Sequence, residues 1–116
     1  MGRVTVREAI EGGDLDTFAE VLAPDVVWVG LLPRQLCRNR AEVVEMLGQA
    51  SRLGVRASPE VVLTGDDMLV VDPHLEPTPA GEPERHHLLV LREDGLVSEV
   101  RVYPNRSAAV AAARAE

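Results

Sequence analysis

The stretch Gly12-Gly13-Asp14-Leu15-Asp16 separates two short helical patterns near the start of the chain. Glycine is the usual residue just past a helix end, so this pair ends a first helix predicted over residues 5–11. Asp14 is a good N-cap for a second helix, and Asp16 lies in its first turn, where a carboxylate favours the helix dipole. The second helix is expected to end at Ala23-Pro24-Asp25. Its apolar stripe is formed by Leu15, Phe18, Ala19 and Leu22.

After the second helix, the sequence predicts one strand, one long helix and four more strands. The β-branched run at residues 26–29, with Trp28 inside it, predicts the first strand. Asn39-Arg40-Ala41-Glu42 is a variant of the capping box and opens a helix that runs to about Leu53. The later strands are predicted at residues 56–64, 68–71, 85–92 and 97–103, with turns at 65–67 and 93–95 and an alanine-rich helix at 107–115.

This order of elements predicts an α+β fold in one domain of 116 residues. We expect a strongly curved, mixed sheet wrapped around the long helix, forming a cone with an internal pocket. The turn at 65–67 is expected to be tight. The strand at 68–71 is expected to continue past Pro73 as an edge strand or a bulge. Residues 76–84 are expected to form an exposed loop, and its stretch 77–83 is not expected to be a domain linker.

Composition excludes several classes of function. The net charge is −7, with twelve arginines and no lysine, so a basic surface for nucleic acid is not expected. No apolar run approaches the ~20 residues of a membrane span, and the first residues do not form a signal peptide. A single cysteine, Cys37, excludes an intramolecular disulfide. We therefore expect a cytoplasmic protein that contacts neither membrane nor nucleic acid.

Two pairs of stretches resemble a known family. They are AIEGGDLD at residues 9–16 with LAPDVVW at 22–28, and LVLREDGLV at 89–97 with RVYPNR at 101–106. They are similar to the opening and closing stretches of nuclear transport factor 2-like, or SnoaL-like, domains. The resemblance implies a cone-shaped α+β fold, often dimeric, with a pocket between sheet and helices. Steroid isomerases, polyketide cyclases, epoxide hydrolases, dehydratases and pure binding domains share this fold, so the site must be argued separately.

The resemblance also shows which catalytic residues are missing. Gly30 stands where a steroid isomerase carries its general-base aspartate, Val6 where it carries a tyrosine, and His87 where it carries a protonated aspartate. Isomerisation by that mechanism is therefore disfavoured. No clear Asp-Arg-Asp relay of the epoxide hydrolase kind is present, although Asp72 and Arg101 keep that mechanism open.

His87 is the candidate catalytic residue. It shares one strand face with Leu89 and Leu91, and the resemblance turns that face toward the cavity. An imidazole there could act as acid, base or hydrogen-bond donor; the alternative is a structural histidine bound to a backbone carbonyl. Trp28 is interpreted as a pocket wall, with a plain core tryptophan as the alternative. The predicted ligand-binding residues are Trp28, Gly30, Leu47, Met68, His74, Leu89, Val100 and Val102.

The remaining polar residues predict no cofactor and no metal. His86 and His87 point to opposite faces of their strand, and His74 with Glu76 lacks a convincing third ligand. His86 shares its face with apolar neighbours, which favours a homodimer through the outer sheet face; a solvated face is the alternative. Cys37 is interpreted as an inert thiol. Solvated charges are predicted for Arg34, Arg38 and Arg40, although three arginines beside a helix start could hold an anion.

The sequence thus favours a small-molecule pocket protein of the SnoaL-like type. It would bind an apolar, polyketide- or steroid-like ligand, or convert it by acid–base chemistry. The alternatives are a non-catalytic dimerisation or interaction module and an accessory protein that sequesters a metabolite.

Overall fold

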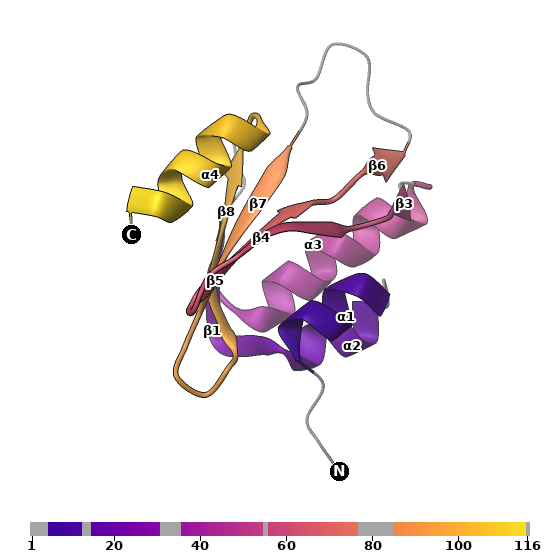
Figure 1. Ribbon diagram of the computed structural model, residues 1–116. Helices are drawn as coiled ribbons and strands as arrows, with labels where there is room; N and C mark the ends of the chain where they lie inside the picture. The colour runs from indigo at the N-terminus through magenta and orange to yellow at the C-terminus, as the bar shows by residue number, and fades with distance from the viewer. Residues whose placement is uncertain (1–4, 13–14, 31–35, 55, 77–84, 116) are drawn as a thin grey trace.

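The computed structural model describes residues 5–12, 15–30, 36–54, 56–76 and 85–115. It shows a mixed α+β architecture, in which a curved, open sheet of six strands carries helices on both faces (Figure 1). The elements are α1 Val6–Gly12, α2 Leu15–Glu20, β1 Leu22–Val29, β2 Leu36–Cys37, α3 Arg40–Arg52, β3 Arg56–Ala57, β4 Glu60–Thr64, β5 Met68–Asp72, β6 Leu75–Glu76, β7 His86–Leu91, β8 Val97–Tyr103 and α4 Arg106–Ala115. The predicted order of elements is confirmed, with short strands added to it.

The strand order in the large sheet is β2-β1-β8-β7-β5-β4, and β3 pairs with β6 in a separate ribbon. β1 runs parallel to β8, whereas the other neighbours are antiparallel, so the predicted mixed sheet is confirmed. Helices α1, α2 and α3 lie on one face of the sheet, which we call the inner face (Figure 1). Helix α4 lies on the opposite, outer face.

The two faces carry two separate hydrophobic clusters. The inner cluster joins the first helices and α3 to the sheet and includes Trp28, Val43, Leu69, Leu89 and Val100. The outer cluster lies under α4 and consists of Met68, Val70, Leu88, Ala109 and Ala113. Partly buried apolar side chains pack against it. Since successive strand residues point to opposite faces, each central strand supplies both clusters.

The long helix α3 begins as the sequence predicts. The Oδ1 atom of Asn39 accepts a hydrogen bond from the Glu42 backbone N–H at 2.9 Å. The Glu42 carboxylate reaches back to the N–H of Arg38 at 2.7 Å, one residue further than in a standard capping box. At the other end, Gly54 takes a φ of 89°, which favours glycine.

The first strand starts earlier than predicted, and this is the main correction to the expected boundaries. Leu22, which was assigned to the stripe of the second helix, is fully buried on β1 and pairs with Val97. Helix α2 already ends at Glu20. Pro24 is tolerated inside β1 because the pairing with β8 shifts register between Leu22 and Val27. The predicted cap Asp14 lies outside the described residues.

The strand predicted at residues 56–64 is divided into β3 and β4 by Ser58 and Pro59. The continuation past Pro73 exists as β6, and the Ser58 N–H donates to the Pro73 carbonyl at 3.0 Å. Both predicted turns are confirmed: the Gly65 N–H donates to the Met68 carbonyl at 2.8 Å, and Gly95 has a φ of 84°. Of the predicted loop at 76–84, Glu76 belongs to β6 instead, and residues 77–84 lie outside the described residues.

Candidate functional site

The inner face of the sheet brings His87 and Trp28 together from strands far apart in sequence. His87 on β7 pairs with Val102 on β8, and the neighbouring pair joins Leu89 to Val100. Trp28 on β1 pairs with Val100 from the other side. These three strands lie side by side, so their inward side chains form one continuous surface.

The His87 and Trp28 rings meet edge to face. Their centroids are 5.0 Å apart and the ring planes are inclined by 73°. This is a favoured arrangement for aromatic rings, because the positive edge of one meets the negative face of the other. Trp28 is only 6% exposed, whereas His87 keeps part of its surface accessible. The histidine is thus the polar and more accessible member of an otherwise apolar wall.

The surroundings of His87 keep its imidazole neutral. Burial lowers its pKa from the ordinary 6.5 to about 4, and the positive charges of Arg85 and of His86, when protonated, act in the same direction. Asp72 opposes these effects by raising the pKa, but does not outweigh them. Near neutral pH the ring therefore offers one N–H donor and one nitrogen acceptor.

Several of the predicted ligand-binding residues gather around this pair. Leu89 and Val100 are buried in the inner cluster, and Leu47 and Val102 pack against it. Gly30 directly follows β1 and is partly exposed. The structure therefore brings the larger part of the predicted wall to the inner face.

Met68 and His74 lie elsewhere, which corrects the predicted wall. Met68 packs in the outer cluster under α4, because it alternates with the inward residues Leu69 and Val71 on β5. His74 follows β5 with a φ of 44°, and its Nε2 lies 3.2 Å from the exposed Glu60 carboxylate.

A comparison with known families assigns the chain to a family. A sequence profile of the SnoaL-like domain matches residues 5–100. The chain belongs to the SnoaL-like domain family. No curated protein matches the sequence.

Solved structures share the fold of this SnoaL-like domain at low identity. A proposed polyketide cyclase from Sinorhizobium meliloti is 17% identical, covers 84% of this chain and 89% of its own, and superposes with a TM-score of 0.63. A protein with a cystatin-like fold from Xanthomonas campestris is 22% identical over 91% and 89%, with a TM-score of 0.65. TerC, co-crystallised with polyporic acid, is 16% identical over 84% of each chain, with a TM-score of 0.57.

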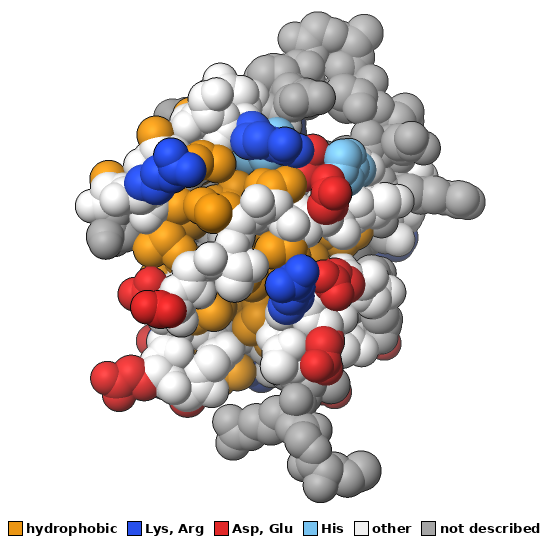
Figure 2. Space-filling model, viewed as in Figure 1, with side chains coloured by type: hydrophobic (Ala, Val, Ile, Leu, Met, Phe, Trp, Pro, Cys, Tyr) orange, Lys and Arg blue, Asp and Glu red, His pale blue; other side chains and the backbone are white. Residues whose placement is uncertain are grey.

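The outer face of the SnoaL-like domain contains a charged cluster that the sequence analysis missed. His86 is 1% exposed, and neither ring nitrogen has a hydrogen-bond partner in the described part of the chain. Its Nε2 lies 3.6 Å from Oδ2 of Asp72, and the same oxygen lies 3.5 Å from His74 Nε2 and 3.9 Å from an Arg106 nitrogen. In Figure 2, histidine side chains lie beside basic and acidic ones in the upper part of the view.

The burial of the face that carries His86 could have been anticipated from one signal. Residues 107–115 are mostly alanine, and a helix with such small side chains packs flat against an apolar sheet face. This composition predicts that the last helix covers the strand face that carries His86 and shields it from solvent. Of the two residues considered for a catalytic relay, Asp72 lies 3.6 Å from His86, and Arg101 pairs with Glu99 at 2.7 Å.

Cys37 has the surroundings of an unreactive thiol. It lies on β2, with its Sγ 3.9 Å from the Met46 sulfur. Burial and the Glu42 charge raise the pKa of the thiol, so the reactive thiolate is disfavoured. Within the described ranges, no three His, Cys, Asp or Glu side chains form a metal-binding group, and no helix is long and apolar enough to cross a membrane.

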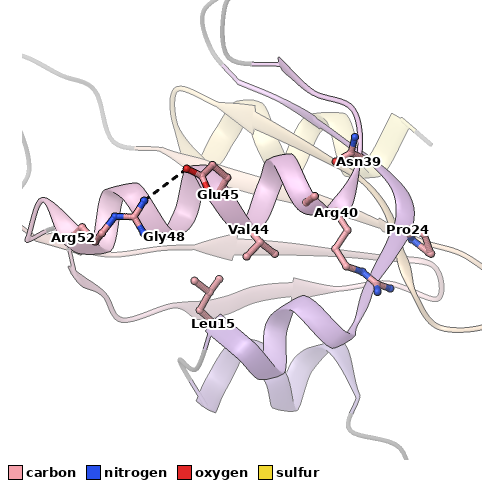
Figure 3. A pocket seen from close by; sticks show the side chains of 9 residues that line it. Leu15, Pro24, Asn39, Arg40, Val44, Glu45, Gly48 and Arg52 are labelled. Carbon is pink, nitrogen blue, oxygen red and sulfur yellow. Dashed lines mark ion pairs between the residues drawn. The ribbon is translucent and has the colours of Figure 1, made fainter.

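A separate groove of about 720 Å³ lies between α2 and α3 (Figure 3). Its lining is Leu15, Pro24, Asn39, Arg40, Ala41, Val44, Glu45, Gly48 and Arg52. None of the predicted pocket residues belongs to it. Among the three arginines singled out in the sequence, Arg40 lines this groove, Arg38 does not, and Arg34 lies outside the described residues.

Proposed function

We propose that this SnoaL-like domain binds an apolar, polyketide- or steroid-like small molecule against the inner face of the sheet. The observation that carries the proposal is the edge-to-face pair of His87 and Trp28 within an apolar wall. Small-molecule sites in proteins are mostly apolar, with a few polar groups that fix the orientation of the ligand. His87 supplies that polar group, and Trp28, which is 6% exposed, forms part of the apolar wall behind it.

The low pKa of His87 defines what this residue contributes. At a pKa of about 4, only about one molecule in a thousand carries the protonated ring at pH 7. The ring therefore serves as a neutral hydrogen-bond partner for a ligand hydroxyl or carbonyl group. A proton-donating role is disfavoured, and acid–base conversion would use the neutral ring as a weak base. Binding is thus the leading proposal and conversion the second.

The relatives support this choice of ligand class. One is a proposed polyketide cyclase, and the structure of another contains polyporic acid. Both share the fold at 16–17% identity, so the assignment to this chain depends on the His87 and Trp28 pair.

The proposal is tested by calorimetric titration with steroids, polyketide fragments and flat aromatic acids. We expect one ligand per chain and at least a tenfold loss of affinity in His87→Phe, which keeps the ring shape but removes both nitrogens. His74→Asn is the matched control, because His74 lies outside the inner cluster. Equal loss in both variants, or no binding by any ligand class, would contradict the proposal. Analysis of the recovered ligand then separates conversion from sequestration.

We also propose that the domain forms a homodimer through the part of the outer face that α4 leaves open. Val29 and Leu36 are paired across β1 and β2 and are 40% and 42% exposed. Exposed apolar pairs beside polar residues are typical of contact surfaces. Sedimentation equilibrium should give a dimer at micromolar concentration and a monomer for Leu36→Asp; a monomeric wild type would reject the interaction-module alternative.

A cytoplasmic location is part of the same proposal. It is supported by the single cysteine, which a reducing compartment keeps as a thiol. Cell fractionation of the tagged, full-length protein tests it, and recovery outside the cytoplasm would contradict it.

A further inference from the structure

The groove between α2 and α3 has the dimensions of a ligand site. Its volume of about 720 Å³ falls within the roughly 300–1,000 Å³ of typical small-molecule pockets. Its lining from α3 includes Ala41, Val44 and Gly48, which recur along one stripe of the helix. The inner cluster uses a different stripe of α3, marked by Val43 and Leu47. The groove is therefore separate from the site of His87.

The floor of the groove is apolar. Figure 3 shows Leu15 of α2 and Val44 of α3 pointing toward one another across it. Gly48 has no side chain to fill the space beyond Val44, and a Cβ there would meet only the Arg52 guanidinium, at 3.5 Å. An apolar ligand body would cover partly exposed surface along this floor, which is favourable.

The two arginines that line the groove differ in their ion pairs. Arg52 at one end has a carboxylate partner, Glu45, at 3.8 Å. Arg40 at the other end donates to the Leu22 carbonyl from Nε, at 3.0 Å, and from an Nη nitrogen, and it has no carboxylate partner within the described ranges. This guanidinium is half-buried in the first turn of α3, where the helix dipole disfavours a cation. A guanidinium without a carboxylate partner keeps N–H groups that can donate to a bound anion.

We propose that this groove is a second ligand site, which binds a carboxylate with an apolar body about 12 Å long. The carboxylate would pair with Arg40, and the body would lie along Leu15 and Val44 toward Gly48. The length follows from the eight residues between Arg40 and Gly48 at 1.5 Å each, or about 12 Å along the helix. The ligand is thus an amphipathic carboxylate, such as a medium-chain fatty acid.

The probe for this site is decanoate, used below its micellar concentration with the intact, isotope-labelled protein. We expect saturable binding of one decanoate per chain, with amide shifts centred on Leu15, Ala41 and Val44. Decyltrimethylammonium has the same chain and the opposite charge, so it should bind at least tenfold more weakly. Equal binding of both probes, or no saturable binding, would overturn the proposal.

Two variants locate the binding. Gly48→Leu fills the groove at a helical position with room for a Cβ and should lower decanoate affinity at least tenfold; Gln49→Leu, one position along, should leave it unchanged. Arg40→Gln should give a similar loss and Arg38→Gln none. Unchanged affinity in Gly48→Leu would overturn the proposal, even if Arg40→Gln were unstable. Decanoate shifts centred on Trp28 would place it at the inner face and would likewise overturn it.

Discussion

Two histidines that are neighbours in the sequence occupy opposite environments in this domain. His87 projects from β7 to the inner face, keeps some accessible surface and meets Trp28 edge to face. His86 projects to the outer face, is 1% exposed and lies 3.6 Å from Asp72 close to the start of α4. One peptide unit of a strand is enough to separate them, because successive side chains alternate between faces.

The comparison shows how one residue type takes two roles through its surroundings. Among apolar side chains, His87 stays neutral and is suited to a ligand hydrogen bond. His86 is buried beside Asp72 on the opposite face of the sheet, the face that α4 covers. The first role is functional in our account, and the second is structural.

The largest expected effect is a difference in unfolding free energy between alanine variants of the two histidines. His86→Ala removes a fully buried ring and leaves a cavity, which should cost roughly 2–5 kcal/mol of unfolding free energy. His87→Ala empties a partly accessible position and should cost about 1 kcal/mol. Urea unfolding of both variants gives the two values. The reverse ranking would make His87 the structural histidine.

The second prediction concerns pH. The pKa of His87 is about 4 in the folded protein and near 6.5 in the unfolded chain, so the unfolded state binds the proton first. Stability should therefore fall as the pH decreases from 6.5 to 4, by about 3 kcal/mol from this residue, and this contribution should change no further below pH 4. His87→Phe lacks the proton-binding group, so its stability should fall less. Parallel curves for wild type and His87→Phe between pH 7 and 4 would contradict the assigned environment.

The third prediction tests the cover over the outer face. Ala109 is fully buried between α4 and the sheet, so Ala109→Leu overpacks this contact and should cost about 1–3 kcal/mol. Ala111 on the same helix is exposed, and Ala111→Leu should change stability by less than about 0.5 kcal/mol. Thermal unfolding of the pair makes the comparison. Equal stability of the two variants would mean that α4 does not pack over this face in solution.

Much of the fold follows from local signals in the sequence. The Asn39 cap and the turn at Gly95 each specify their element through short-range chemistry, and the structure confirms them. The predicted apolar stripe of α3 is not buried throughout, because Val43 is buried whereas Leu53 is 84% exposed. The start of β1 at Leu22 does not follow from local signals. A leucine after a helical stripe suits either element, and only its pairing with Val97, far along the chain, decides between them.

The site was predictable to the extent that strand alternation decides it. The placement of His86 and His87 on opposite faces follows from the period of two in a strand, and the family resemblance indicated that His87 faces inward. Met68 was placed on the wrong face because residues 68–71 of β5 are all apolar, so this run does not distinguish the two faces. The groove beside Arg40 depends on how α2 packs against α3, which no periodicity within either helix specifies.

The most direct test of the account uses Trp28, the only tryptophan in the chain. Purified wild type and His87→Phe are titrated with polyketide fragments, steroids and flat aromatic ligands, and the emission of Trp28 is followed. The account predicts saturable quenching or a spectral shift in the wild type and at least tenfold weaker binding in His87→Phe. Emission that stays blue and unchanged across the whole panel would contradict it, because Trp28 would then be a core residue without contact to a ligand.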